Sequence, residues 1–544
     1  MRVTSYIPED AAREDWDVVV VGTGMGGSTL GYELARRGRR VLFVEKGRFL
    51  HGDPRLNAAP AGGCRESEAR LRVGRWPERI QGWTSFGPVE FFAPLGCGTG
   101  GSTTLYGAQL ERFTPGDLQP RAQFPEVQEA NLPERWPISY EELLPFYRRA
   151  EEHYSVCGTQ DALNPDGQAR LRTPPPLSER DQLIHDAFTA QGLHPYRSHV
   201  GYHQLQDCWE CIDLCPRRCK GDAGSRSLLP ALQRHGASLL PECEVLELLA
   251  ERRRVTAIRA RQGGRELRIR ARVFVLACGA LSTPALLLRS RSADWPEGLA
   301  NSSGAVGRNL MLHTSDFLLI DPREERSAAG PVKSLSLNDF YCGERGKLGT
   351  LQSVGLRPQA PFILAYLRYL EEKDPRWWRR PLSRHLPRLA ELAGRRFRRG
   401  SVFSTIVEDL PYADNRVLLD PGVPGGFRFV YAYSGELRRR NQLFRRELRR
   451  RLAPRLRLRV VTGGTNNINY GHACGTCRFG EDPATSVLDR DNRAHDLDNL
   501  YVSDGSFFPS SGGTNPSLTI AANALRVAGI IAGTLGGSAE PGGK

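Results

Sequence analysis

Two polar residues near the end of the chain have the chemistry to act on a small molecule. His472 lies in the run Gly-His-Ala-Cys-Gly, and Asn515 directly precedes Pro516. Both are embedded among glycines and apolar residues, which suits a pair that holds a small polar group against a flat cofactor. A histidine has a pKa near neutrality and can accept a proton from a hydroxyl group. On these residues alone, a hydrogen-bonded core histidine remains the alternative for His472.

A glycine motif near the N-terminus has the spacing of a dinucleotide-binding turn. Residues 17–21 read Asp-Val-Val-Val-Val, a run typical of a buried parallel strand, and Gly22-Thr-Gly-Met-Gly-Gly27 follows directly. The next residues predict a helix ending near Gly38, and a second strand over 41–44 ends at Glu45. Gly22 makes the tight turn, Gly24 admits the pyrophosphate and Gly27 allows close helix packing, while Glu45 is expected to bind the ribose hydroxyls. The motif alone does not separate FAD from NAD.

Four cysteines lie within twelve residues in the middle of the chain. They are Cys208, Cys211, Cys215 and Cys219, and Pro216 lies between the last two. Pro216 argues against one continuous helix, so the cysteines could instead hold zinc or an iron–sulfur cluster in a loop. Thiols with a structural role, or with none, are the favoured interpretation, and no metal site is predicted.

Composition narrows the class of protein. The chain has 544 residues, 12 cysteines and a formal net charge of +14. No nucleic-acid motif accompanies the arginines, so a nucleic-acid partner is not expected. No secretory signal and no membrane span is recognised, and the longest near-apolar run, 273–288, predicts a strand and a helix. A cytoplasmic location is expected, with peripheral membrane contact as an option for the arginine-rich segment 376–400. The alternative for that segment is a solvated helical cap with Leu382, Leu386 and Leu389 facing inward.

Several further motifs resemble those of the glucose–methanol–choline (GMC) family. They are the glycine-rich loop 95–107 (LGCGTGGSTTLYG), residues 136–147 (WPISYEELLPFY), 273–289 (VFVLACGALSTPALLLR), 306–313 (VGRNLMLH), and the C-terminal runs 471–480 and 499–516. They occur in the family order and span nearly the whole chain. One position departs from the pattern, because Tyr106 stands where many members have Asn in the flavin loop.

The resemblance implies an α/β fold: a Rossmann-like, doubly wound FAD-binding domain interleaved with an α+β substrate-binding domain. The expected flavin-binding pieces are 1–115, 200–310 and 465–544, and the substrate domain is expected at 116–199 and 311–464. The tail after Gly536 is glycine-rich and is expected to be disordered.

The resemblance also implies FAD as cofactor and oxidation of an alcohol by proton abstraction and hydride transfer to flavin N5. It places His472 on the family's active-site histidine and Asn515 on its partner position. The cofactor contacts expected from the motif and the resemblance are Gly22, Gly24, Gly27, Glu45, Gly101, Ser102, Tyr106, Gly107, Val245, Asp504 and Asn515. The stretch Lys220-Gly-Asp-Ala223 resembles flavin oxidases that act on aminosugar alcohols.

Two other functions remain open at this point. One is a non-oxidative lyase of the same family that retains FAD. The other is an electron-relay subunit whose cysteines carry an iron–sulfur cluster. The electron acceptor, oxygen or another compound, is not predicted.

Overall fold

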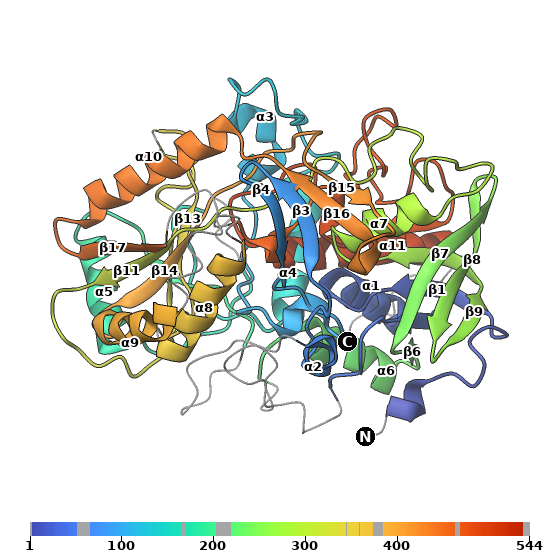
Figure 1. Cartoon of the computed structure of the whole chain (residues 1–544), viewed down its shortest axis with the longest axis horizontal. Helices are drawn as coiled ribbons and strands as arrows, with labels where there is room; N and C mark the ends of the chain where they lie inside the picture. Colours follow the sequence, from blue (N-terminus) through green and yellow to red (C-terminus); the bar gives the residue numbers. More distant parts are fainter. Residues whose placement is uncertain are drawn as a thin grey trace.

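The β-branched run near the N-terminus forms the central strand of a parallel sheet in this computed structural model (Figure 1). From edge to edge the strands are β18 (Leu500–Val502), β10 (Ala271–Leu276), β1 (Trp16–Val21), β2 (Val41–Val44) and β6 (Ser238–Leu240). All neighbouring strands are parallel, so their carboxyl ends share one edge of the sheet. The structure describes residues 3–51, 66–164, 169–202, 219–343, 345–357, 359–373, 384–462 and 468–536.

Both faces of this sheet are covered, which explains why β1 has no polar side of its own. Val18 and Val20 pack with helices α1 (Met25–Arg36), α6 (Leu229–Arg234) and α11 (Ser517–Thr534). Val19 and Val21 belong to the core on the opposite face, together with the antiparallel strands β7 (Cys243–Glu251), β8 (Arg254–Gln262) and β9 (Arg265–Ile269). Alternate side chains of a strand point to opposite faces, so two covers require a continuous apolar run.

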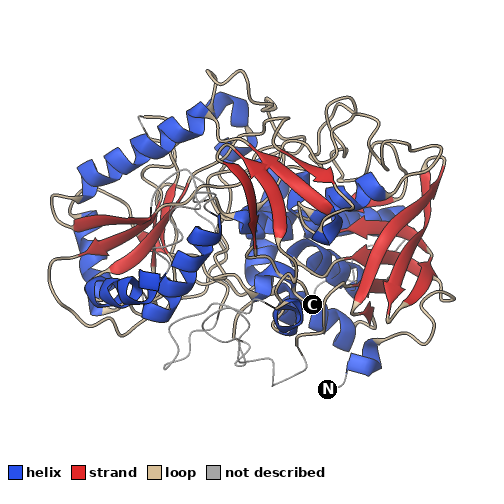
Figure 2. Ribbon diagram, viewed as in Figure 1, coloured by secondary structure: helices blue, strands red, loops and turns tan. Residues whose placement is uncertain are grey.

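A six-stranded antiparallel sheet forms the second part of the molecule (Figure 2). Its order is β17 (Arg457–Thr462), β11 (Phe317–Asp321), β14 (Ser401–Ile406), β13 (Thr350–Ser353), β12 (Leu335–Leu337) and β5 (Tyr196–Arg197). Helices α5 (Glu179–Thr189) and α10 (Gly435–Leu452) contribute buried apolar residues to the core of this sheet. Helices α8 (Ala360–Lys373) and α9 (Leu386–Phe397) pack against each other at its flank.

A smaller mixed sheet joins the two parts. Its order is β15 (Arg416–Leu419), β16 (Phe427–Tyr431), β3 (Ile80–Thr84) and β4 (Gly87–Phe91), with β16 parallel to β3. The strands of the parallel sheet all come from the pieces expected to bind flavin, and those of the six-stranded sheet from the pieces expected to bind substrate. The mixed sheet draws on both. The remaining helices are α2 (Ser67–Arg72), α3 (Pro120–Gln123), α4 (Tyr140–His153) and α7 (Ser282–Arg289).

The fold class is the one expected, and the interleaving follows from the strand order. The exact domain boundaries stay a prediction. Helix α4 comes from the piece 116–199 assigned to the substrate domain, yet it packs against α11 of the parallel-sheet part.

In the part of the chain that the structure describes, α11 is the one helix with the length and composition of a membrane span, and 67% of that window is buried in the protein. It packs against α1 and α4, as a core helix does. Residues 273–288 form β10 and α7, as predicted.

Candidate active site

The glycine motif forms a turn between β1 and α1 at the carboxyl edge of the parallel sheet. Gly22 has a φ of +95°, and a Cβ there would lie 2.4 Å from the carbonyl oxygen of Ala277. A Cβ on Gly27 would lie 2.2 Å from the carbonyl oxygen of Gly22. Any side chain at these two positions would therefore push the turn or α1 out of place.

Gly24 is glycine for a different reason. It is the N-cap of α1 with a φ of −72°, and a Cβ built there meets no atom within 4 Å. Open space thus lies at the N-terminus of a twelve-residue helix, where backbone N–H groups and the helix dipole attract phosphate. Gly101 closes the other side, since its Cβ position lies 2.8 Å from Gly24 Cα. The residues present therefore fit the pyrophosphate of a dinucleotide.

Glu45 is held rigidly beside this turn. Its Oε2 accepts hydrogen bonds from the Thr23 backbone N–H at 3.1 Å and from the Thr23 hydroxyl at 2.6 Å. Its Oε1 accepts one from the Gly47 N–H at 2.9 Å. A carboxylate has about four acceptor positions, so oxygens oriented in this way keep capacity for ribose hydroxyls.

The glycine-rich loop 95–107 lines the same cavity. The Ser102 hydroxyl oxygen accepts a hydrogen bond from the Gly96 N–H at 3.0 Å, and Gly107 approaches Lys333 so closely that a Cβ would lie 2.7 Å from its Nζ. The Tyr106 hydroxyl donates to the carbonyl of Gly221 at 2.7 Å. The residue that departs from the family pattern therefore braces this loop against residue 221, while its ring remains part of the cavity wall.

Asp504 is buried where β18 ends. Its Oδ2 accepts from the Gly279 N–H at 2.8 Å and from the Thr283 hydroxyl at 2.6 Å, and its Oδ1 accepts from the N–H of Ser506 at 2.8 Å. Burial raises the pKa of Asp504 above the usual range, and these hydrogen bonds oppose that shift. The carboxyl group is thus fixed on the cavity wall at the sheet edge.

The structure brings His472 and Asn515 together. His472 ends a short 3-10 turn, Tyr470–His472, and its Nε2 lies 3.5 Å from Asn515 Nδ2. Its Nδ1 lies 3.0 Å from Nδ1 of His313. Asn515 is held in turn by Gln352, whose Nε2 donates to Asn515 Oδ1 at 3.1 Å.

Both imidazoles of this pair are neutral at neutral pH. Burial lowers the pKa of His472 well below the usual histidine range, and the neighbouring His313 lowers it further. Burial lowers the pKa of His313 to about 4. A neutral imidazole keeps one ring nitrogen with a free lone pair, which is what a proton acceptor needs.

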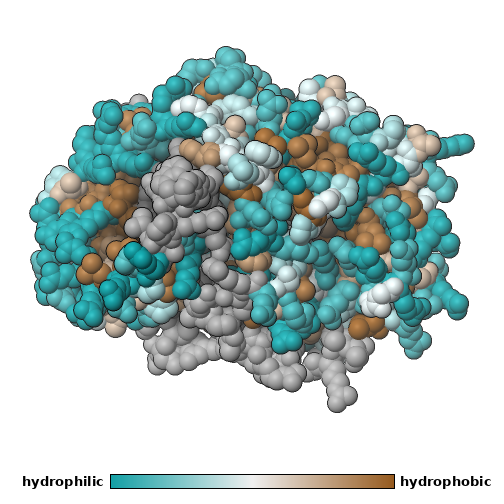
Figure 3. Space-filling view, in the orientation of Figure 1, coloured by the Kyte–Doolittle hydropathy of each residue, from teal (hydrophilic) through white to brown (hydrophobic). Residues whose placement is uncertain are grey.

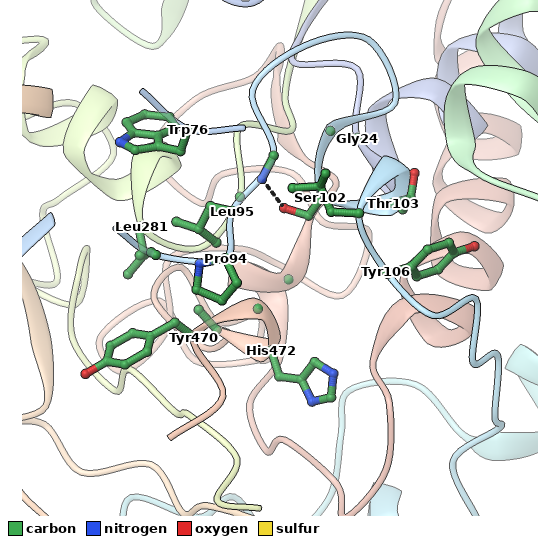
Figure 4. A pocket seen from close by; sticks show the side chains of 18 of the residues that line it. Gly24, Trp76, Pro94, Leu95, Ser102, Thr103, Tyr106, Leu281, Tyr470 and His472 are labelled. Atoms are coloured by element: carbon green, nitrogen blue, oxygen red, sulfur yellow. Dashed lines mark hydrogen bonds between the residues drawn. The ribbon is translucent and has the colours of Figure 1, made fainter. Parts of the chain in front are cut away.

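One cavity of about 1020 Å³ connects the dinucleotide turn to His472 and Asn515 (Figure 4). Gly24, Ser102, Tyr106 and His472 lie on its walls in that view. Of the predicted site residues, those that line it are Gly22, Gly24, Glu45, Gly101, Ser102, Tyr106, Gly107, Val245, Asp504, His472 and Asn515. Gly27 does not line it, in keeping with its expected role in helix packing.

Sequence reasoning missed His313 and Gln352. His313 ends the Val-Gly-Arg-Asn-Leu-x-x-His turn, which was interpreted only as a family marker, so a signal was present. Gln352 lies on β13 of the antiparallel sheet, where no motif marks it.

The cysteine segment stays a prediction. Cys208, Cys211 and Cys215 lie outside the described residues, and Cys219 is buried. Among the residues that the structure does describe, no group of three or more His, Cys, Asp or Glu side chains could hold a metal ion.

Comparison with known proteins agrees with this geometry. The N-terminal model of the GMC oxidoreductase family matches residues 18–315, and its C-terminal model matches residues 437–524. The pyridoxine 4-oxidase structure from Mesorbium loti has a TM-score of 0.65 at 22% identity, covering 95% of this chain and 99% of that one. A fungal aryl-alcohol oxidase structure has a TM-score of 0.61 at 16% identity, covering 96% and 99%. These two show the fold.

Two curated relatives are more similar in sequence. Paromamine 6'-oxidase of Streptomyces fradiae is 32% identical over 96% of this chain and 92% of its own length. The 6'''-hydroxyparomomycin C oxidase of Streptomyces lividus is 31% identical with the same coverage. With both family models matched in order and these relatives aligned over nearly the whole length, the chain belongs to the GMC oxidoreductase family.

Proposed function

We propose that this FAD-dependent oxidoreductase, which acts on the CH–OH group of an alcohol, takes a sugar or aminosugar as its substrate. The observation that carries the oxidation of an alcohol is the His472–Asn515 pair, placed in the cavity that also contains the dinucleotide turn. Two relatives that are more than 30% identical to this chain are named as oxidases of paromamine and of a hydroxyparomomycin, which supports the substrate class.

The proposed chemistry divides between the two polar residues. His472 accepts the hydroxyl proton through Nε2, and Asn515 Nδ2 donates a hydrogen bond to the same alcohol oxygen. Bound FAD supplies the hydride acceptor. Placement and proton transfer are the protein's contribution, and a general base of this kind is typically worth about 10² to 10⁴-fold in rate.

The cavity wall beside His472 and Asn515 combines aromatic rings with polar groups. Phe317 of β11 and Tyr366 of α8 meet edge to face with ring centroids 5.2 Å apart, and both line the cavity. Gln352 and Ser404 line it as well. Flat rings suit the C–H faces of a sugar, and amide and hydroxyl groups suit its remaining hydroxyls. This combination of aromatic and hydrogen-bonding side chains supports a substrate that is a polar ring, such as a sugar.

The lyase and the electron-relay alternatives are not favoured. Curated relatives of this chain are named as oxidases and dehydrogenases; besides the two oxidases, a 2-methyl-1,2-propanediol dehydrogenase is 26% identical over 95% of this chain. A lyase would retain FAD without reducing it, so the state of the flavin separates the two.

Anaerobic addition of alcohols to the purified holoenzyme tests the proposed function. We expect paromamine or a neutral sugar to bleach the visible flavin absorbance, and the analogue lacking the reactive hydroxyl to leave it unchanged. Air admitted afterwards restores the oxidised spectrum if oxygen is the acceptor, as the names of the two oxidases suggest. A flavin that stays oxidised with every sugar and aminosugar, but is bleached by an apolar alcohol, contradicts the substrate class.

We also propose that α9 brings the enzyme, as a cytoplasmic protein, to an anionic membrane surface. The alternative of a solvated cap with its leucines inward is wrong at Leu389, which is 50% exposed; Leu386 is half-buried, and Leu382 lies outside the described residues. Leu389 and Leu392, the latter 65% exposed, form the apolar part of this surface. They lie three residues apart on one helix, with exposed arginines at 388, 395 and 396. Figure 3 shows apolar residues scattered in a mainly hydrophilic surface on this side of the molecule. Exposed leucines beside basic residues suit an interface with acidic lipids.

Vesicle sedimentation tests this surface. We expect the holoenzyme to sediment with vesicles containing phosphatidylserine, less with pure phosphatidylcholine, and less at high salt. Leu389→Ser with Leu392→Ser should remove most of the binding. Leu418→Ser, at an exposed leucine of β15, is the matched control and should bind as the wild type does. Equal binding by all three proteins would contradict the proposal.

A further inference from the structure

The hydrogen bonds of His313 determine which of its ring nitrogens carries the hydrogen. A backbone carbonyl can only accept a hydrogen bond, and His313 Nε2 lies 2.8 Å from the carbonyl oxygen of Gly512. That nitrogen must therefore carry hydrogen. Because His313 is fully buried and neutral, its Nδ1 has no hydrogen and can only accept.

The tautomer of His313 in turn determines the tautomer of His472. Nδ1 of His472 lies 3.0 Å from Nδ1 of His313, and a hydrogen bond between them needs a hydrogen on the His472 side. A neutral His472 then has its lone pair on Nε2, the nitrogen that faces Asn515. We propose that His313 is a positioning residue that holds the His472 imidazole in the one tautomer able to accept the substrate proton through Nε2. This inference rests on the proposed role of His472.

Asn515 supports the same assignment from the other side. Gln352 Nε2 donates to Asn515 Oδ1, which leaves Asn515 Nδ2 directed at His472 Nε2. An amide N–H toward Nε2 is favourable only if that nitrogen offers a lone pair. The contacts of His313 and those of Asn515 therefore both place the lone pair of His472 on Nε2.

The backbone at Gly512 is held by a buried charged cluster, defined here as Asp117, Lys347 and Glu408. The Gly512 N–H donates to Glu408 Oε1 at 3.1 Å, and Lys347 Nζ contacts both Glu408 and Asp117. Gly512 has a φ of +61°, and a Cβ there would lie 2.7 Å from the ring of Phe113. The N–H and the carbonyl of Gly512 thus both have buried partners, Glu408 and His313 respectively, so the carbonyl has one orientation toward His313.

The tautomer can be measured directly by ¹⁵N NMR on holoenzyme labelled at histidine nitrogens, with His472→Gln used to assign the signal. We expect His472 to be neutral at neutral pH with its hydrogen on Nδ1. In His313→Leu the acceptor is gone, and we expect the hydrogen to shift to Nε2. A wild-type His472 with its hydrogen on Nε2 would overturn the proposal, and this measurement needs no variant at position 313.

Kinetics provide the second measurement. We expect His313→Leu to slow anaerobic flavin reduction by about 10²-fold, less than the roughly 10⁴-fold loss when an orienting carboxylate is removed from a serine-protease triad, because a neutral partner orients less strongly. His313→Asn places an amide oxygen near the former Nδ1 and should recover part of the rate. A merely structural role would slow both variants alike without moving the NMR signal, and that result would refute the inference. A tautomer as expected, with a fast His472→Ala enzyme, would instead contradict the proposed function alone.

Discussion

Replacing His472 with alanine is expected to slow reduction of the bound flavin by about 10² to 10⁴-fold while FAD is retained. The loss should fall on the reductive step, because the alanine removes the nitrogen that accepts the hydroxyl proton. Retention is expected because the dinucleotide turn, Glu45 and Asp504 are held by partners that do not include His472. Rapid anaerobic mixing with the substrate measures the reduction rate, and the absorbance of the released flavin measures occupancy.

The pH dependence follows from the lowered pKa of His472. Only the neutral imidazole accepts a proton, so the reduction rate should be level at neutral pH and fall as the pH drops below the usual histidine range. The alanine variant should lose this acid limb. Asn515→Ala is the matched comparison: it removes a positioning hydrogen bond, so its loss should be smaller and its acid limb should remain. A His472→Ala enzyme that reduces its flavin at the wild-type rate would show that another group is the base.

The dinucleotide half of this site was predictable because its signals are local. A valine run, three glycines at fixed spacing, a helix and a second strand lie within about thirty residues, and the structure has β1, α1 and β2 where the sequence predicts them. Gly24 and Glu45 could be named because a single turn and a single strand end determine where they lie.

The substrate half depends on contacts between distant residues, which no local pattern reveals. The contacts of His313 with His472 and of Gln352 with Asn515 join residues 159 and 163 positions apart, and neighbouring strands in the antiparallel sheet are separated by comparable lengths of sequence. The parallel pairing of β3 with β16 is of the same kind. The sequence leaves open whether Leu389 faces inward, because helical spacing identifies an apolar stripe but not whether a partner covers it; in the structure this side chain is exposed.

The second large effect is expected at Gly24, where valine should abolish FAD retention while the fold is preserved. Gly24 has a negative φ and a Cβ built there meets no protein atom, so the backbone accepts a side chain. The space that the side chain enters is the one at the N-terminus of α1, where the pyrophosphate is expected. We therefore expect a colourless protein with the circular dichroism spectrum and the melting temperature of the wild-type apoprotein.

Two other glycines make this result specific to the cofactor. Gly22→Ala should lower the melting temperature of the apoprotein as well, because its Cβ meets the Ala277 carbonyl and its φ is positive. Gly529→Ala in α11, where a Cβ also meets nothing, should keep both the fold and the flavin. The three variants thus separate loss of the turn, loss of the phosphate space and a harmless added methyl group. Full FAD occupancy in Gly24→Val would mean that the pyrophosphate lies elsewhere, and with it the assignment of this turn to the cofactor would fall.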